Sequence, residues 1–274
     1  MLHRLPAKRK SQRLLAIRPG GLGDCILSFP ALESLRQRAS YLEVWVPSPV
    51  VPLVRFADRV RSISSTGLDL VGLPGVDSPP ELLQNFDAIV SWYGSNRREF
   101  REATALLPIE FHKALPPPDS TLHAADFFAT QLQAPIPATP HIKLDNQTKR
   151  NFIAIHPFSG SPRKNWPLDQ FDALAQALSQ PVEWCATAEQ GLGPRAPALI
   201  ANDLSQVARW LASARIYIGN DSGITHLAAA VGTPVIALFQ ASDPRLWAPR
   251  GTSITLLESA TLESTVTAAR QLFY

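Results

Sequence analysis

Hydrophobic and polar positions follow two different periods along this chain. Short apolar runs, typical of buried strands, alternate with segments whose apolar residues recur every three to four positions, as on one face of a helix. The strands expected from the runs are 13–17, 41–46, 59–64, 87–92, 152–157, 182–186, 216–219 and 253–258, and the helices are 25–38, 50–57, 96–107, 168–180, 204–214 and 261–274. Strands that alternate with helices predict βαβ units on parallel sheets.

The alternation stops once, near the middle of the chain. Residues 133–150 are rich in proline and polar side chains and show neither period, which is the composition of a linker. We therefore expect two α/β domains, residues 1–140 and 141–274. Open parallel sheets bind ligands at the carboxyl ends of their strands, so the sequence predicts a ligand site between the two domains.

The composition narrows the class of protein. The 274 residues are 45% hydrophobic and 18% charged, and the formal net charge of +3 is too small to indicate a nucleic-acid partner. No apolar run approaches the ~18 residues of a membrane span. Cys25 and Cys185 lie in apolar runs, as buried thiols do in a reducing compartment. With an N-terminus too basic for a signal peptide, these features predict a cytoplasmic protein.

Positive charge gathers before the first strand. The basic side chains of this segment are His3, Arg4, Lys8, Arg9, Lys10 and Arg13. One interpretation is a solvated tail. The other is a weak patch for an anionic membrane surface, which would make the protein a peripheral membrane protein.

The first strand is followed by a glycine-rich loop, "IRPGGLGDC". Only Gly21 and Gly23 fit a dinucleotide fingerprint, and Ile26 occupies the third glycine position, so the spacing argues against a nicotinamide site. The turn can still bring backbone close to a ligand. Asp24 is either a helix cap or a carboxylate that accepts a proton from an attacking hydroxyl group.

A second polar loop, "HPFSGSPRKNWP", follows the first strand of the second half. Ser159, Gly160 and Ser161 offer hydroxyl groups and backbone N–H groups, and Arg163 and Lys164 offer positive charge. A diphosphate needs these groups, and the following helix adds its positive end. A surface turn with incidental basic residues is the competing interpretation.

The last two loops carry acidic and polar residues. Glu189, just beyond a strand, can accept hydrogen bonds from ribose hydroxyls or can be a solvated loop residue. In "GNDSGITH", Asp221, Ser222 and Gly223 stand at the first turn of a helix, where an anion is stabilised by unpaired N–H groups. His226 lies one turn deeper on the same face. A plain helix cap is the alternative for this segment.

Three of these segments resemble one known family. "IRPGGLGDCILSFPALESLR", "HPFSGSPRKNWPLDQF" and "GNDSGITHLAAAVGTPVIALF" are similar to the signature segments of glycosyltransferase family 9, the ADP-heptose:lipopolysaccharide heptosyltransferases. The resemblance implies a GT-B fold, with two Rossmann-like domains that face each other across a cleft. It also implies a sugar-nucleotide donor in the C-terminal domain, no metal and no separate cofactor.

The resemblance implies a role for each residue of the donor side. Lys164 matches the lysine that contacts the donor phosphates. Asp221 matches the aspartate near the donor sugar in the family's D-[ST]-G-x-x-H segment, with Ser222 and Gly223 at the diphosphate and His226 completing the motif. Ser159, Gly160 and Ser161, by their own chemistry, would assist at the diphosphate.

On the acceptor side the resemblance is weaker. Asp24 matches the aspartate proposed as catalytic base. Glu189, which belongs to the donor side, falls about where the family places its ribose-binding glutamate and is a looser match. The segment "SWYGSNRREF" (91–100) departs from the family's Asp-x-x-Gly-x-x-Arg pattern. The donor class is therefore better supported than the acceptor.

The sequence as a whole predicts an inverting, metal-independent glycosyltransferase that moves a heptose from ADP-heptose to a lipopolysaccharide-core or related glycan acceptor. Such an acceptor, lipid-linked or oligosaccharide, would bring the protein to the inner face of a bacterial inner membrane. Two alternatives remain open at this stage. One is a catalytically silent sugar-nucleotide-binding protein, and the other is a nicotinamide-dependent oxidoreductase.

Overall fold

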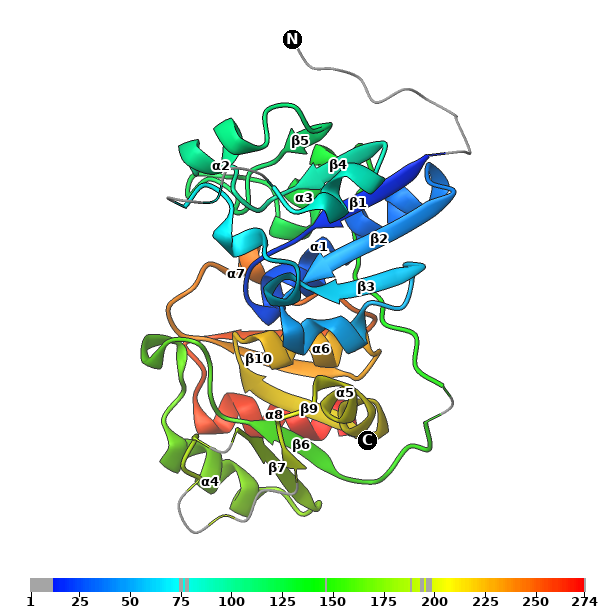
Figure 1. Cartoon of the computed structure of the whole chain (residues 1–274). Coiled ribbons are helices and arrows are strands. Elements are labelled where there is room, and N and C mark those ends of the chain that lie inside the picture. The colour runs from blue at the N-terminus through cyan, green and yellow to red at the C-terminus, as the bar shows by residue number, and fades with distance from the viewer. Residues whose placement is uncertain are drawn as a thin grey trace. The chain divides into compact units, whose positions relative to one another are not determined.

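The chain forms two compact α/β units, seen in a computed structural model (Figure 1). The first comprises the residues up to Gly21, Ser28–Pro118 and Ala125–Ala138, and the second comprises Leu22–Leu27, Asp119–Ala124 and Thr139–Tyr274. The residues that the structure describes are 12–73, 76, 79–145, 147–187, 189–192, 195 and 199–273. The basic residues 3–10, on which a membrane contact was predicted, lie outside these ranges.

The division at Ala138/Thr139 lies next to the boundary expected at residue 140, but the two units are not simple halves of the sequence. Two short segments from the first half, 22–27 and 119–124, pack with the second unit. His123 illustrates this packing, since its Nε2 lies 2.8 Å from the carbonyl oxygen of Ala248. The beginning of the helix that carries Asp24 therefore belongs with the second unit.

A parallel sheet of five strands, in the order β3-β2-β1-β4-β5, forms the centre of the first unit. The strands are β1 (Arg13–Ile17), β2 (Tyr41–Val46), β3 (Arg59–Ser62), β4 (Ala88–Ser91) and β5 (Ile109–Phe111). The helices in this part of the sequence are α1 (Leu22–Ser34), α2 (Arg98–Ala103) and α3 (Ala124–Gln131), with short 3₁₀ helices between strands. One face of the sheet packs on an apolar core that includes Leu15, Trp45 and Phe100.

The second unit contains a parallel sheet of six strands, in the order β11-β10-β9-β6-β7-β8. The strands are β6 (Ile153–His156), β7 (Val182–Ala186), β8 (Leu199–Ile200), β9 (Ile216–Asn220), β10 (Val235–Phe239) and β11 (Ile254–Glu258). The helices are α4 (Leu168–Ala177), α5 (Leu204–Ser213), α6 (Gly223–Ala230), α7 (Pro244–Trp247) and α8 (Leu262–Phe273). All residues of the central strands β6, β9 and β10 are buried, as expected for parallel strands covered on both faces.

Most of the predicted helices and strands are present, and the predictions that are wrong have physical causes. The helix expected over 25–38 begins earlier, at Leu22, so Asp24 is its third residue. The helix expected over 50–57 is instead a 3₁₀ helix, Ser48–Leu53, whose two prolines cannot donate backbone hydrogen bonds. The unpredicted helix α3 buries residues on several sides, which hides the helical period.

No helix within the described part of the chain is long and apolar enough to cross a membrane.

Candidate functional site

The order of strands in the second sheet brings three of the predicted loops to one edge. β6 lies between β9 and β7, and all three run in the same direction, so the loops that follow them leave from the same edge. The predicted site residues on these loops are Ser159, Gly160, Ser161, Lys164, Glu189 and Asp221. Topology therefore assembles residues that are up to 62 positions apart in the chain, from 159 to 221.

Asn220, the last residue of β9, ties two of these loops together. Its side-chain oxygen accepts a hydrogen bond from the backbone N–H of Trp166 (2.8 Å), and its amide nitrogen donates to the carbonyl oxygen of Pro157 (2.7 Å). The side chain is fully buried, so both bonds are protected from water. Sequence reasoning did not assign a role to Asn220; an amide at the end of an otherwise apolar strand was the available signal.

Asp221 is the centre of a buried polar cluster. Its Oδ2 accepts hydrogen bonds from the ammonium of Lys164 (2.7 Å) and from the hydroxyl of Ser242 (2.5 Å). The Asp221 residue is only 4% exposed, whereas the Lys164 side chain is 36% exposed and reaches the surface. The two residues predicted to contact different parts of the donor thus form an ion pair with each other. Ser242, on the loop after β10, is a member of the cluster that sequence reasoning missed.

Ser222 caps helix α6. Its hydroxyl accepts a hydrogen bond from the backbone N–H of Thr225 (3.3 Å) and lies 3.1 Å from the Thr225 hydroxyl, which in turn lies 3.1 Å from the hydroxyl of Tyr217. Ser222 therefore has the structural role of a cap in this structure. The backbone N–H groups at this helix start are the groups that remain for an anion.

The beginnings of α1 and α6 pack directly against each other within the second unit. A Cβ atom on Gly23 would lie 2.9 Å from Cδ2 of His226, and one on Gly223 would lie 2.7 Å from Cβ of Leu22. Both distances are too short for a side chain, so only glycine fits at either position. This close approach carries Asp24, a half-buried residue in the first turn of α1, to the turn that holds Asp221 and His226. Asp24 is not the cap residue, because the helix begins before it.

His226 is buried beside this cluster. Its Nε2 lies 3.9 Å from Oδ1 of Asp221, and among the described residues its Nδ1 has no hydrogen-bond partner. Burial lowers its pKa to about 4; Asp221 acts in the opposite direction, whereas His123 and Lys164 add to the lowering. The imidazole is neutral at pH 7, and its Nδ1 is a buried nitrogen without a partner among the described residues.

The other predicted donor contacts differ in how firmly the fold holds them. The Ser159 hydroxyl lies 2.7 Å from Oδ1 of Asn165 and 2.8 Å from the carbonyl oxygen of Ser161, and these contacts hold the loop in its turn. Gly160 is exposed, and a Cβ atom there would meet nothing within 4 Å. Glu189 is also exposed; hydrogen bonds from its own backbone N–H and from Thr187 lower its pKa. Glu189 is therefore not part of the buried cluster.

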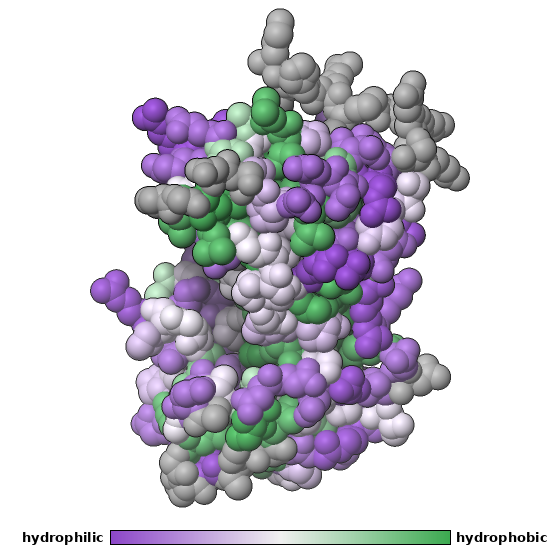
Figure 2. Space-filling model, viewed as in Figure 1, coloured by the Kyte–Doolittle hydropathy of each residue, from purple (hydrophilic) through white to green (hydrophobic). Residues whose placement is uncertain are grey.

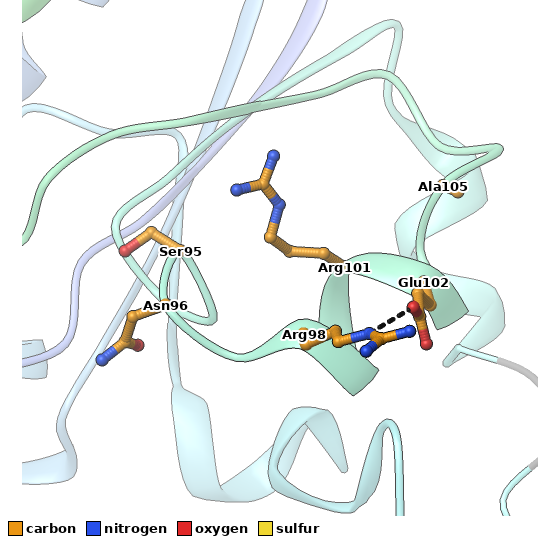
Figure 3. Close-up of a pocket in the computed structure, with 6 residues that line it drawn as sticks. All are labelled: Ser95, Asn96, Arg98, Arg101, Glu102 and Ala105. Atoms are coloured by element: carbon orange, nitrogen blue, oxygen red, sulfur yellow. Dashed lines mark hydrogen bonds and ion pairs between the residues drawn. The ribbon is translucent and has the colours of Figure 1, made fainter.

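The first unit has an open cavity of about 530 Å³ beside α2 (Figure 3). Its lining residues are Ser95, Asn96, Arg98, Arg101, Glu102 and Ala105. Arg98 pairs with Glu102 at 2.8 Å on the surface, whereas Arg101 points away from that pair and lies 5.3 Å from the centre of the Phe111 ring. The segment that departs from the family pattern thus presents guanidinium groups at this cavity.

The segment 91–100 nevertheless keeps two of the three fixed positions of that pattern, Gly94 and Arg97, with Ser91 in place of aspartate. Gly94 has a φ of +72°, and a Cβ atom there would lie 2.2 Å from the Phe100 ring. Arg97 donates to the carbonyl oxygen of Val71 (3.1 Å). Both residues support the local backbone.

Three or more His, Cys, Asp or Glu side chains do not converge as a metal site anywhere among the described residues.

Comparison with known proteins identifies the class. The model of glycosyltransferase family 9 (heptosyltransferase) matches residues 197–271. A search of curated proteins finds no match. Among solved structures, a family 9 glycosyl transferase from Veillonella parvula DSM 2008 is 18% identical with a TM-score of 0.76, covering 97% of this chain and 98% of that one. The ADP-heptose lps heptosyltransferase II of E. coli is 15% identical, with a TM-score of 0.76 and coverage of 95% and 98%.

A third solved structure is described as iron-containing. The dodecameric glycosyltransferase TibC from enterotoxigenic E. coli H10407, described as iron-containing, is 17% identical with a TM-score of 0.63, covering 93% of this chain and 67% of that one. Residues 197–271 thus match glycosyltransferase family 9, the family that the sequence was predicted to resemble, and the solved structures confirm the predicted GT-B fold.

The buried His226 makes stability depend on pH. Its pKa of about 4 lies below the unfolded value of 6.5, so the unfolded chain binds more protons and stability falls as pH falls from 6.5 to 4. In His226→Gln we expect the slope of unfolding free energy against pH to decrease by up to about 1.4 kcal/mol per pH unit. Denaturant titrations across that range measure the slope. His141→Gln, at an exposed position, is the control; identical slopes in both variants would contradict the expectation.

Proposed function

We propose that this protein is an inverting glycosyltransferase that moves a heptose from ADP-heptose to a lipopolysaccharide-core or related glycan acceptor. The observation that supports it best is the packing of the Asp24 turn against the turn that holds Asp221 and His226. This packing brings the turn of Asp24 close to the Asp221–Lys164 ion pair and to the neutral His226. A base for the acceptor and contacts for the donor are the two requirements of direct displacement.

On the donor side, Lys164 and the beginning of α6 would bind the diphosphate. The ammonium of Lys164 is held by Asp221 but is partly exposed, so it can contact a phosphate oxygen without leaving its partner. Negative charge develops on the diphosphate as the bond to the anomeric carbon breaks, and preorganised cationic donors stabilise that charge. Ser159, Gly160 and Ser161 would add hydroxyl and backbone donors from the same loop, and Gly223 from the helix start.

The donor sugar would lie beside the remaining acceptors of this cluster. Asp221 Oδ1 can bond to a sugar hydroxyl, since within the described residues its contact with His226 Nε2 is 3.9 Å long. The Nδ1 of His226 is buried without a partner, so the ring would have to move before this nitrogen could bond to the sugar. Glu189 would bond to the ribose hydroxyls of the nucleotide, for which its exposed position requires movement of its turn. Inversion follows from a single displacement at the anomeric carbon.

Asp24 would be the general base. The acceptor hydroxyl transfers its proton to the Asp24 carboxylate, its oxygen bonds to the anomeric carbon, and ADP leaves with the bonding electron pair. The cavity beside α2 favours an acceptor that carries anionic groups, because Arg98 and Arg101 line it. A lipid-linked acceptor of this kind would bring the protein to the inner face of a bacterial inner membrane, with the basic segment before residue 12 near anionic headgroups.

Asp24→Asn is the central test of this function. We expect transfer from ADP-heptose to fall by about 10²–10⁴-fold, because the amide cannot accept the proton. Affinity for ADP should stay within about twofold, since the carboxylate is assigned to the acceptor. Glu33→Gln, which removes an exposed carboxylate from the same helix, should retain wild-type rate.

Two results would contradict the proposal in different ways. Full activity in Asp24→Asn would exclude this residue as base while leaving the transferase intact. If the wild-type protein binds ADP-heptose but transfers the sugar to none of a panel of glycan acceptors, it is instead a catalytically silent sugar-nucleotide-binding protein. The observation that favours this alternative is Ser91, which stands where the family pattern has aspartate.

Lys164→Ala tests the diphosphate contact. We expect ADP binding to weaken by about 1.5–3 kcal/mol, the value of a hydrogen bond to a charged group. The melting temperature should also fall, because the buried Asp221 carboxylate loses its counter-ion. Arg163→Ala removes an exposed charge from the same loop and is the matched control. Calorimetric titration with ADP decides; equal weakening in both variants would indicate only a general electrostatic effect.

Metal independence is part of the proposal, because Lys164 and the start of α6 would neutralise the diphosphate. Transfer should therefore continue in excess EDTA at the rate without chelator. TibC, the iron-containing relative, makes this test informative. Activity lost on chelation and restored by iron, magnesium or manganese would show that a cation assists the leaving group.

A further inference from the structure

A second cationic site lies at the amino end of β1, at the opposite end of this strand from the turn Gly20–Gly21. Strand register places Arg13 opposite Tyr41, Glu43 opposite Arg59 and Trp45 opposite Arg61. Alternate residues of a strand share a face, so all of these side chains lie on the face that carries Leu15 and Trp45 of the apolar core. Towards the amino ends of β1, β2 and β3, this face changes from apolar to charged.

These side chains line a cavity of about 410 Å³. Its lining residues are Arg13, Tyr41, Glu43, Arg59, Arg61, Leu82, Asn85 and Phe86. Strands β1 and β2 begin on the right of Figure 1, and Figure 2 shows hydrophilic residues gathered on that side of the first unit. The cavity lies at the amino end of β1, whereas the turn Gly20–Gly21 follows its carboxyl end.

Glu43 is the buried centre of the cavity wall. It accepts hydrogen bonds from the Tyr41 hydroxyl (2.9 Å), the Trp45 Nε1 (2.8 Å) and the Arg61 Nε (2.6 Å). Burial alone would raise the pKa of Glu43, but the three hydrogen bonds together outweigh it and hold the pKa below its usual value. The carboxylate is therefore ionised, and it orients Arg61 by accepting a hydrogen bond from its Nε. The two terminal nitrogens of Arg61 are not used in this bond.

The positive charges of this cavity exceed its negative charge. Three guanidinium groups, of Arg13, Arg59 and Arg61, face one carboxylate, which leaves a local charge of +2 (3 − 1). The Nε of Arg13 donates a hydrogen bond to the carbonyl oxygen of Asn85 (3.0 Å). Its guanidinium carbon lies over the Tyr41 ring, 4.1 Å from the ring centre. Within the described part of the chain, the terminal nitrogens of these three arginines have no hydrogen-bond partner. Like charges held this close repel each other unless an anion joins them.

We propose that this cavity binds a phosphate group, either as inorganic phosphate or as a phosphate monoester. The guanidinium groups of Arg13, Arg59 and Arg61 line one cavity and have more N–H donors than one carboxylate can accept. A phosphate dianion offers at least three acceptor oxygens. Phe86 and Leu82 add an apolar wall beside the charged floor, which suits the organic part of a monoester. The site goes beyond the proposed transferase activity and does not depend on it.

The test is calorimetric titration of the full chain with sodium phosphate at pH 7.5, with ionic strength held constant by sodium chloride. We expect saturable binding in the wild type and at least tenfold weaker binding in Arg59→Ala. Arg59 is exposed, and the hydrogen bonds to Glu43 within the described residues come from Tyr41, Trp45 and Arg61, so removal of the Arg59 side chain should leave the fold intact. Arg59→Lys, which keeps the charge and loses the fork, should bind with intermediate affinity.

Two controls separate this site from the others. Arg209→Ala removes an exposed arginine from helix α5 of the second unit, which has no assigned role, and should bind phosphate as the wild type does. Lys164→Ala separates the two anion sites: phosphate bound at the donor diphosphate site would be lost in this variant, whereas phosphate bound in the cavity of β1, β2 and β3 should be retained. No saturable binding in the wild type, equal affinity in Arg59→Ala, or loss in Lys164→Ala instead would each overturn the proposal.

A second titration, with glycerol 3-phosphate, distinguishes the two sources of the phosphate group. Tighter binding than inorganic phosphate, lost in Arg59→Ala, would identify an organic phosphate as the ligand. Binding equal to or weaker than inorganic phosphate, with the same dependence on Arg59, would identify the free ion.

Discussion

The ion pair between Lys164 and Asp221 is the interaction on which the candidate site depends. A buried carboxylate is costly unless it is paired and hydrogen-bonded, and Asp221 meets this condition through Lys164 and Ser242. The pair joins the loop after β6 to the end of β9, and Asn220 fixes the backbone of the same two segments. The polar groups are therefore in position before any ligand arrives, and a ligand need not order them.

Glycine provides the second constraint. Gly23 and Gly223 leave room for the first turns of α1 and α6 to touch, with the His226 ring against Gly23. At the base of the same loop, a Cβ atom on Gly219 would lie 2.9 Å from the carbonyl oxygen of His156 and would also strike the Tyr217 side chain. The "GNDSG" stretch is thus a set of positions with separate physical tasks. Some of them are purely structural, such as the cap at Ser222, and others leave groups exposed to a ligand.

The first unit also contains a buried carboxylate that holds a cationic side chain. One face of its sheet is apolar around Trp45 and becomes charged towards the amino ends of the strands, where Glu43 binds Arg61. A buried carboxylate again organises a cation, as Asp221 does in the second unit. In both units the acidic residue is paired with a cationic side chain of the protein, so the nitrogen atoms that this lysine or arginine leaves unpaired are the ones that can contact an anion. The two sites lie at different ends of the strands: at the carboxyl ends in the second unit and at the amino ends in the first.

Local patterns in the sequence determined the strands, the parallel sheets, the linker region and the loops that carry Lys164, Asp221 and His226, because strand burial, turn chemistry and glycine spacing act over a few residues. Only the tertiary structure decided which of these residues meet. The pairing of Lys164 with Asp221, the cap role of Ser222, the packing of Gly23 on His226 and the exposure of Glu189 depend on strand order and on contacts between distant segments. The start of α1 at Leu22 and the burial of α3 were likewise set by packing, which no local period records. The cavity around Glu43 needed the register of three strands before its charges could be counted on one face.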